Sequence, residues 1–87
     1  MTLPPALRAL FPGCPEQVWV SASTVAAVLA ALDTRWPGMR DRLSEPGRVR
    51  RHIRVFVDGE PAGLETRLRP GAEVFVMTAI SGEIATR

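Results

Sequence analysis

One segment limits the choice of fold more than any other part of the sequence: a single amphipathic helix, predicted over about residues 24 to 36. Apolar side chains recur there at the spacing that places them on one stripe of a helix. Ser23 precedes the segment and is expected to cap its first turn, and Pro37-Gly38 ends it. The apolar stripe consists of Val25, Val28, Leu29, Leu32 and Trp36.

The remainder of the chain is divided by turns into segments with the period of β-strands. Residues 48 to 57 are predicted to form one long strand that ends at Asp58-Gly59, a dipeptide typical of tight hairpins. A short return strand follows, and residues 73 to 80 form the last predicted strand. An earlier strand is predicted around Trp19, and one further helical turn over residues 39 to 43. The expected order is strand, helix, strand, short strand, strand.

The last predicted strand is apolar on both faces. Val74, Val76 and Ile80 share one face, whereas Phe75, Met77 and Ala79 share the other. A single helix covers only one face of a sheet. The second apolar face is therefore either part of a buried core or an exposed patch for a partner.

Composition excludes several classes of protein. With 46% hydrophobic and 23% charged residues, the 87-residue chain has the composition of one globular domain. All basic side chains apart from His52 are arginine, so Schiff-base lysine chemistry and a Walker-type phosphate lysine are excluded, and the net charge of +2 indicates no nucleic-acid partner. The N-terminus lacks the pattern of a signal peptide, and no apolar stretch is long enough to span a membrane. We expect a cytoplasmic protein.

Three polar features have ordinary structural interpretations. His52 is expected to be a solvated side chain on a strand, because no second histidine accompanies it. Cys14, the only cysteine, lies in a loop where it could be exposed, and we interpret it as an inert thiol. The basic run of Arg48, Arg50, Arg51 and Arg54 is interpreted as a solvated sheet face, with docking to an acidic partner as the alternative.

Several segments together resemble the MoaD/ThiS family of ubiquitin-like sulfur carriers. They are residues 20 to 25 leading into the helix, 36 to 39, 53 to 59, 68 to 74, and the closing residues 79 to 82. The resemblance implies an α+β fold of the ubiquitin-like β-grasp class, in which a mixed sheet of about four to five strands packs on one main helix. It also implies one domain over residues 1 to 82 and a C-terminal tail over residues 83 to 87.

The family resemblance implies a carrier and not an independent enzyme. In these proteins an activating enzyme adenylates the C-terminal glycine carboxylate and converts it to a thiocarboxylate. Here Ser81 and Gly82 match the carrier tail, but Glu83 stands where the terminal glycine belongs. Activity would therefore need trimming to Gly82. The alternative is a carrier-derived interaction module or small oligomer without sulfur transfer.

The resemblance also implies partners. They are an E1-like activating enzyme, a molybdopterin synthase large subunit or another sulfur acceptor, and a metallopeptidase that trims the tail. No cofactor, metal, catalytic residue, nucleic acid or membrane is expected. The predicted partner-binding surface consists of Arg54, Phe56, Phe75 and Met77.

The start of the chain departs from the family pattern. Only residues 1 to 3 are free to form a first strand before Pro4-Pro5. Either this strand is very short, or the given start is too late, or another chain adds a strand beside residues 73 to 80. The third alternative would produce a homo-oligomer through a sheet edge.

Overall fold

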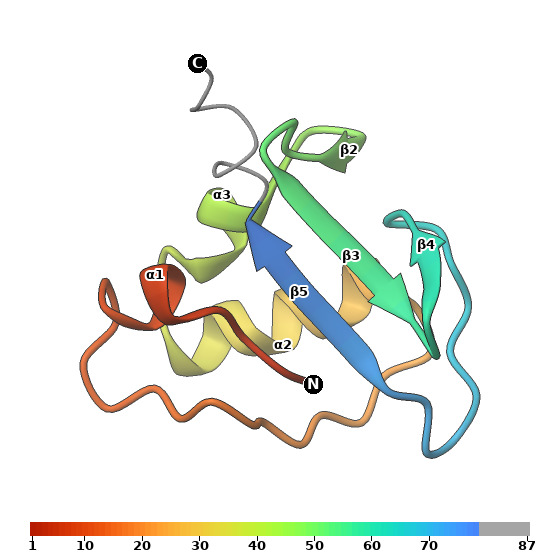
Figure 1. Cartoon of the computed structure of the whole chain (residues 1–87), viewed down its shortest axis with the longest axis horizontal. Coiled ribbons are helices and arrows are strands. Elements are labelled where there is room, and N and C mark those ends of the chain that lie inside the picture. Colours follow the sequence, from red (N-terminus) through yellow and green to blue (C-terminus); the bar gives the residue numbers. More distant parts are fainter. Residues whose placement is uncertain (79–87) are drawn as a thin grey trace.

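The computed structural model describes residues 1–78, which form three helices and five short strands around one core (Figure 1). The helices are α1 (Pro5–Arg8), α2 (Val25–Arg35) and α3 (Met39–Leu43). The strands are β1 (Ser44–Glu45), β2 (Arg48–Val49), β3 (Ile53–Val57), β4 (Glu60–Ala62) and β5 (Val74–Thr78).

The main sheet is built around β3, which pairs antiparallel with β4 on one side and with β5 on the other. The predicted hairpin after β3 is confirmed, since Asp58 and Gly59 have φ angles of 51° and 85°. Such positive angles at both central residues match the twist of a tight two-residue hairpin turn. Together with α2, this arrangement is the expected α+β β-grasp fold.

The N-terminal residues extend this sheet and make it mixed. Thr2 pairs in parallel with β5: its N–H donates to the Val74 carbonyl at 2.8 Å, and its carbonyl accepts from the Val76 N–H at 3.0 Å. Pro4 has no N–H with which to continue the ladder. The first of the three alternatives given for the start of the chain is therefore the one observed: the first strand is present but very short.

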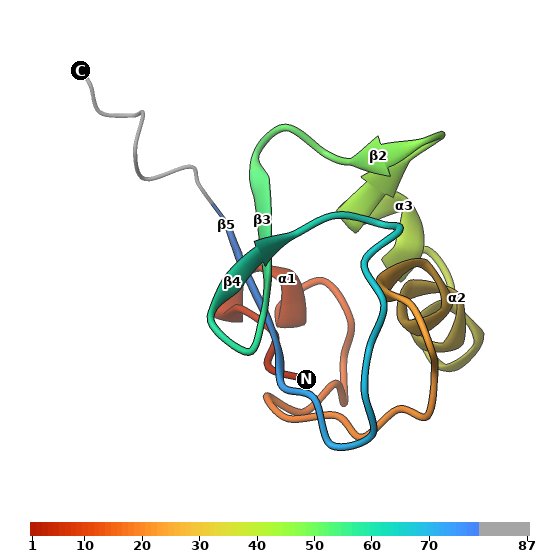
Figure 2. The ribbon, with the colours of Figure 1, turned by 90° about the vertical axis from the view of Figure 1, so that its right-hand side faces the viewer.

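Helix α2 covers one face of the sheet (Figure 2). It agrees with the predicted helix to within one residue at each end, but its cap differs from the prediction. The side chain of Thr24, and not that of Ser23, accepts a hydrogen bond from the Ala27 N–H at 3.1 Å. The predicted apolar stripe faces the core, where Val25, Val28, Leu29 and Leu32 are buried.

The connection from α2 to α3 depends on one carboxylate. Oδ1 of Asp33 accepts hydrogen bonds from the backbone N–H groups of Gly38 at 3.0 Å and Arg40 at 3.1 Å. Gly38 adopts a φ of 97°, which is easy only for glycine. The extra helical turn predicted over residues 39 to 43 is confirmed as α3, and its Met39 and Leu43 complete the core.

The prediction of one long strand over residues 48 to 57 was wrong. Arg48–Val49 forms a small hairpin with Ser44–Glu45, and a turn then separates it from β3. The Ile53 N–H closes this turn on the Arg50 carbonyl at 2.9 Å. Val49 and Ile53 have the same parity, so the alternating pattern passes through the turn without a visible break.

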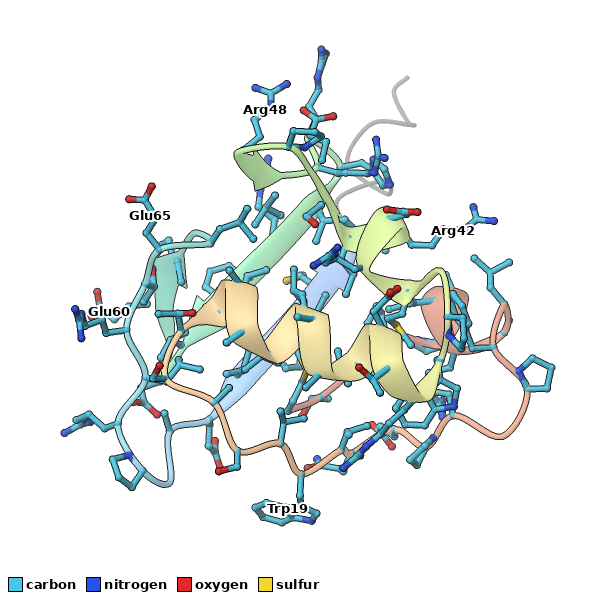
Figure 3. All side chains as sticks on the ribbon, turned by 180° about the vertical axis from the view of Figure 1, so that it is seen from behind. Trp19, Arg42, Arg48, Glu60 and Glu65 are labelled. Carbon is cyan, nitrogen blue, oxygen red and sulfur yellow. The ribbon has the colours of Figure 1, made fainter. Side chains whose placement is uncertain are left out.

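The strand predicted around Trp19 is also not regular. The segment pairs with the N-terminal residues through an antiparallel bridge between Gln17 and Thr2, and the Val18 N–H donates to the Met1 carbonyl at 2.9 Å. Val18 is buried. Trp19 is 84% exposed (Figure 3). Within residues 1–78, no helix is long and apolar enough to cross a membrane.

Candidate functional site

Strand β5 presents two kinds of side chain to two different environments. Val74 and Val76 are buried beneath α2, whereas Phe75 is 45% and Met77 39% exposed. Alternation along the strand places the exposed pair on the sheet face opposite α2. The second apolar face of this strand was interpreted either as buried core or as an exposed patch, and the structure shows the exposed patch.

All four residues of the predicted partner surface meet on this face. Phe75 lies directly opposite Phe56 on the neighbouring strand, and Met77 lies opposite Arg54. Phe56 is half-buried, whereas Arg54 is exposed and donates from Nη1 to the Arg51 carbonyl at 3.1 Å. We call Arg54, Phe56, Phe75 and Met77 the outer face. Paired side chains on adjacent strands form a continuous surface, so the outer face is one patch.

The outer face lies at the base of the C-terminal segment. The last described residue, Thr78, pairs with Ile53, the first residue of β3. The chain therefore continues from the end of the sheet where β3 begins. Ser81 and Gly82, the predicted carrier residues, lie outside the described residues, as do the last two positions of the strand predicted over residues 73 to 80.

Arginines are concentrated at this same end of the molecule. Residues 40 to 54 contain six arginines but only two acidic residues, Asp41 and Glu45. Glu45 pairs with Arg48 and, at 3.4 Å, with Arg50. The hydrogen bond from Arg48, and then its positive charge, lower the pKa of the Glu45 carboxyl. Arg42 and Arg48 project from this region in Figure 3.

A hollow of about 430 Å³ opens beside β3 at the point where β4 stops. Its apolar lining residues include Val49, Phe56 and Pro61, and its basic lining residues are Arg50, Arg51 and Arg54. The sequence analysis missed this feature because it placed residues 48 to 57 in one straight strand. The run of three polar residues 50 to 52 between Val49 and Ile53 was the available signal for a turn.

The remaining candidate residues have structural roles. Cys14 lies in the predicted loop but is buried, and burial raises the pKa of its thiol despite the opposing charge of Arg8. His52 is exposed, as predicted, but it lies in the turn before β3 and not on a strand. In the part of the chain that the structure describes, no three histidine, cysteine or acidic side chains are grouped so that they could hold a metal ion.

Comparison with known proteins assigns the chain to a family. The model of the ThiS family matches residues 4–82, which is most of the chain and includes every strand of the described sheet. This chain belongs to the ThiS family. Its membership confirms the resemblance on which the predicted fold was based.

Individual ThiS relatives agree with this assignment. The sulfur carrier protein CysO of Mycobacterium tuberculosis is 30% identical over 77 residues, which cover 80% of this chain and 83% of that protein. The crystal structure of M. tuberculosis CysO matches with a TM-score of 0.80 and 29% identity, covering 90% of this chain and 94% of the other. A chain in the Amycolatopsis orientalis BexX/CysO complex matches with a TM-score of 0.82 and 26% identity, over 90% and 91% of the two chains.

Proposed function

We propose that this protein acts as a sulfur carrier through its C-terminal tail, once the residues after Gly82 have been removed. The observation that carries the proposal is the extent of the ThiS match, which continues through β5 and ends at Gly82. The CysO relatives are named as sulfur carriers. The carrier domain then comprises residues 1 to 82, and residues 83 to 87 form a removable extension that a metallopeptidase would cleave.

The proposed chemistry uses a backbone carboxylate and no catalytic side chain of this protein. An E1-like enzyme would direct a carboxylate oxygen of terminal Gly82 to the α-phosphorus of ATP, and pyrophosphate would leave. A hydrosulfide ion would then add to the acyl carbon, AMP would depart as the leaving group, and the carrier would be left with a C-terminal thiocarboxylate. Glycine suits this terminus because a Cβ would obstruct its approach through a narrow channel, and Ser81 precedes it. The need for ATP favours a cytoplasmic location.

The outer face is the proposed docking surface for the activating enzyme and for a sulfur acceptor, such as a molybdopterin synthase large subunit. Aromatic residues, methionine and arginine are enriched in protein interfaces, and this face presents all three kinds. Support also comes from the BexX/CysO complex, in which a related carrier is bound to a partner protein. The position of Thr78 beside Ile53 supports docking close to the base of the tail.

Intact-mass spectrometry tests the proposal. A chain ending at Gly82 is incubated with ATP, a sulfide source and the E1-like enzyme of the same genome. We expect replacement of one carboxyl oxygen by sulfur in this chain and an unchanged mass in the full-length chain, because Glu83 and the following residues block the terminus.

The control is a chain with Glu83→Gly that ends at residue 83 and so restores the paired glycines. Conversion of this control but not of the chain ending at Gly82 would overturn the proposed processing site. Failure of both chains, each shown to be folded by circular dichroism, would overturn sulfur carriage itself.

The second candidate is an interaction module without sulfur transfer. It is favoured by the combination of Glu83 in the sequence with an exposed Phe75 and Met77. Such a module would bind its partner with the full-length chain and would not require ATP. If the module is a homo-oligomer paired through a sheet edge, light scattering across a concentration series will show a dimer or larger species.

A further inference from the structure

The hollow beside β3 is lined by both apolar residues and arginines. Its lining includes Arg50, Arg51 and Arg54 together with Val49, Phe56 and Pro61. Arg51 and Arg54 are exposed, and no acidic side chain lies in ion-pair contact with either of them in the part of the chain that the structure describes. These two charges therefore remain available for a ligand.

Charge is distributed unevenly along the chain. Residues 40 to 54 carry six arginines against two acidic side chains, whereas residues 58 to 73 carry two arginines against four acidic ones. Glu60 and Glu65 project away from the region of Arg48 in Figure 3. An approaching acidic surface is therefore attracted to the region that holds the hollow and repelled by residues 58 to 73.

We propose that this hollow binds an acidic segment of a partner protein that also carries apolar side chains. The guanidinium groups would pair with carboxylates, and the apolar side chains would pack on Val49, Phe56 and Pro61. A nucleic acid would require aromatic side chains on which bases stack, and Phe56, the one aromatic residue of the lining, is half-buried in the sheet. The structure therefore favours a peptide over a nucleic acid.

The location of the hollow connects this inference to the proposed function. Arg54 also belongs to the outer face, and Ile53 pairs with the last described residue before the tail. An acidic segment bound here would hold a partner beside the start of the tail. Only the identity of the partner as an activating or accepting enzyme rests on the proposed function, because binding itself needs no sulfur chemistry.

Titration of the ¹⁵N-labelled full-length chain with a short peptide of alternating glutamate and leucine tests the inference. We expect amide chemical-shift changes at Arg50, Arg51, Arg54 and Phe56, and none at Glu65 or Arg67. Binding should weaken as salt is raised, because exposed charge pairs are screened. A peptide in which lysine replaces glutamate should not bind.

Two variants with equal net charge separate position from overall charge. Arg51→Gln/Arg54→Gln removes two charges from the hollow, and Arg67→Gln/Arg69→Gln removes two from residues 58 to 73. We expect the first variant to lose about three- to tenfold in affinity for the peptide, as two exposed ion pairs are lost, and the second to bind like the wild type. Circular dichroism melting checks that both variants fold.

Each other outcome overturns the inference. Equal losses in the two variants would show that only net charge matters, and shifts confined to other residues would place the site elsewhere. Tighter binding of a short oligothymidylate than of the glutamate-leucine peptide would assign the hollow to nucleic acid. Absence of binding at millimolar peptide would show that the hollow takes no acidic segment. None of these results depends on whether Gly82 is activated.

Discussion

Asp58 connects the β3–β4 turn to the segment that enters β5. Its carboxylate accepts a hydrogen bond from the Glu73 backbone N–H at 3.0 Å and a second from the Arg69 guanidinium at 3.3 Å. The backbone hydrogen bond, and then the one from Arg69, lower the pKa of this carboxyl. Because the folded state favours the ionised form, Asp58 stabilises the fold at neutral pH.

This stabilisation should be lost in acid. A carboxyl whose pKa is lower in the folded than in the unfolded state contributes fully above about pH 5 and loses its contribution as the pH falls below about 4. We therefore expect Asp58→Asn to lower the Tm at pH 7 and to reduce the fall in Tm between neutral and acidic pH. Thermal melts across this range check the slope. Glu60→Gln, which removes a neighbouring exposed carboxylate, should retain the wild-type slope; an equal change in both variants would contradict the assignment.

At the scale of elements, the cap of α2 is specific to one side chain. Thr24 is bonded to the Ala27 N–H, whereas no cap bond is made by Ser23. Thr24→Ala should lower the free energy of unfolding by about 1 kcal/mol, because a helix N–H loses its partner. Urea unfolding measures this change. Ser23→Ala is the control, with an expected effect within about 0.5 kcal/mol, and a larger loss from Ser23 than from Thr24 would reverse the assignment.

The helices and strands were predicted accurately where turn-forming residues mark their ends in the sequence. The helix was predicted almost to its ends because its apolar stripe stops at Pro37-Gly38, and the hairpin because Asp58-Gly59 tolerates positive φ angles. The turn before Ile53 contains neither proline nor glycine, so its one local signal was the run of polar residues 50 to 52. The segment around Trp19 has a strand-like composition, but it forms a bridge and hydrogen bonds with residues 1 to 3 and no regular strand.

At the scale of the whole molecule, the first residues of the chain connect distant parts of the fold. Leu3 is only 1% exposed, its N–H donates to the Glu16 carbonyl at 2.9 Å, and the adjacent Thr2 pairs with β5. Leu3→Ala should therefore lower the free energy of unfolding by about 2–5 kcal/mol, the cost of a buried cavity. Leu10, which is 50% exposed, provides the control. Urea unfolding measures both changes. Leu10→Ala should change the free energy of unfolding by less than about 0.5 kcal/mol, and equal effects of the two substitutions would show that residues 1 to 3 contribute nothing to the core.

The candidate site was predictable in its chemistry but not in its arrangement. Family-like segments predicted Gly82 as the carrier residue, which stays a prediction, and strand parity grouped Phe75 with Met77. The register of β3 against β5, which places Arg54 beside Met77, depends on pairing between segments far apart in the sequence. The hollow depends on where β4 stops, and a one-dimensional pattern does not contain that information.

Helix α2 covers only one side of the sheet, so the two faces of β5 tolerate substitution for different reasons. Replacing Val74 or Val76 alters the packing of the core, so these positions are restricted by folding. Phe75 and Met77 are the residues that alternate with them, and their exposed side chains are restricted mainly by whatever they touch outside the molecule. Proteins that share this strand could therefore change partners by substitutions at its exposed positions alone. Such substitutions would cost little thermodynamic stability.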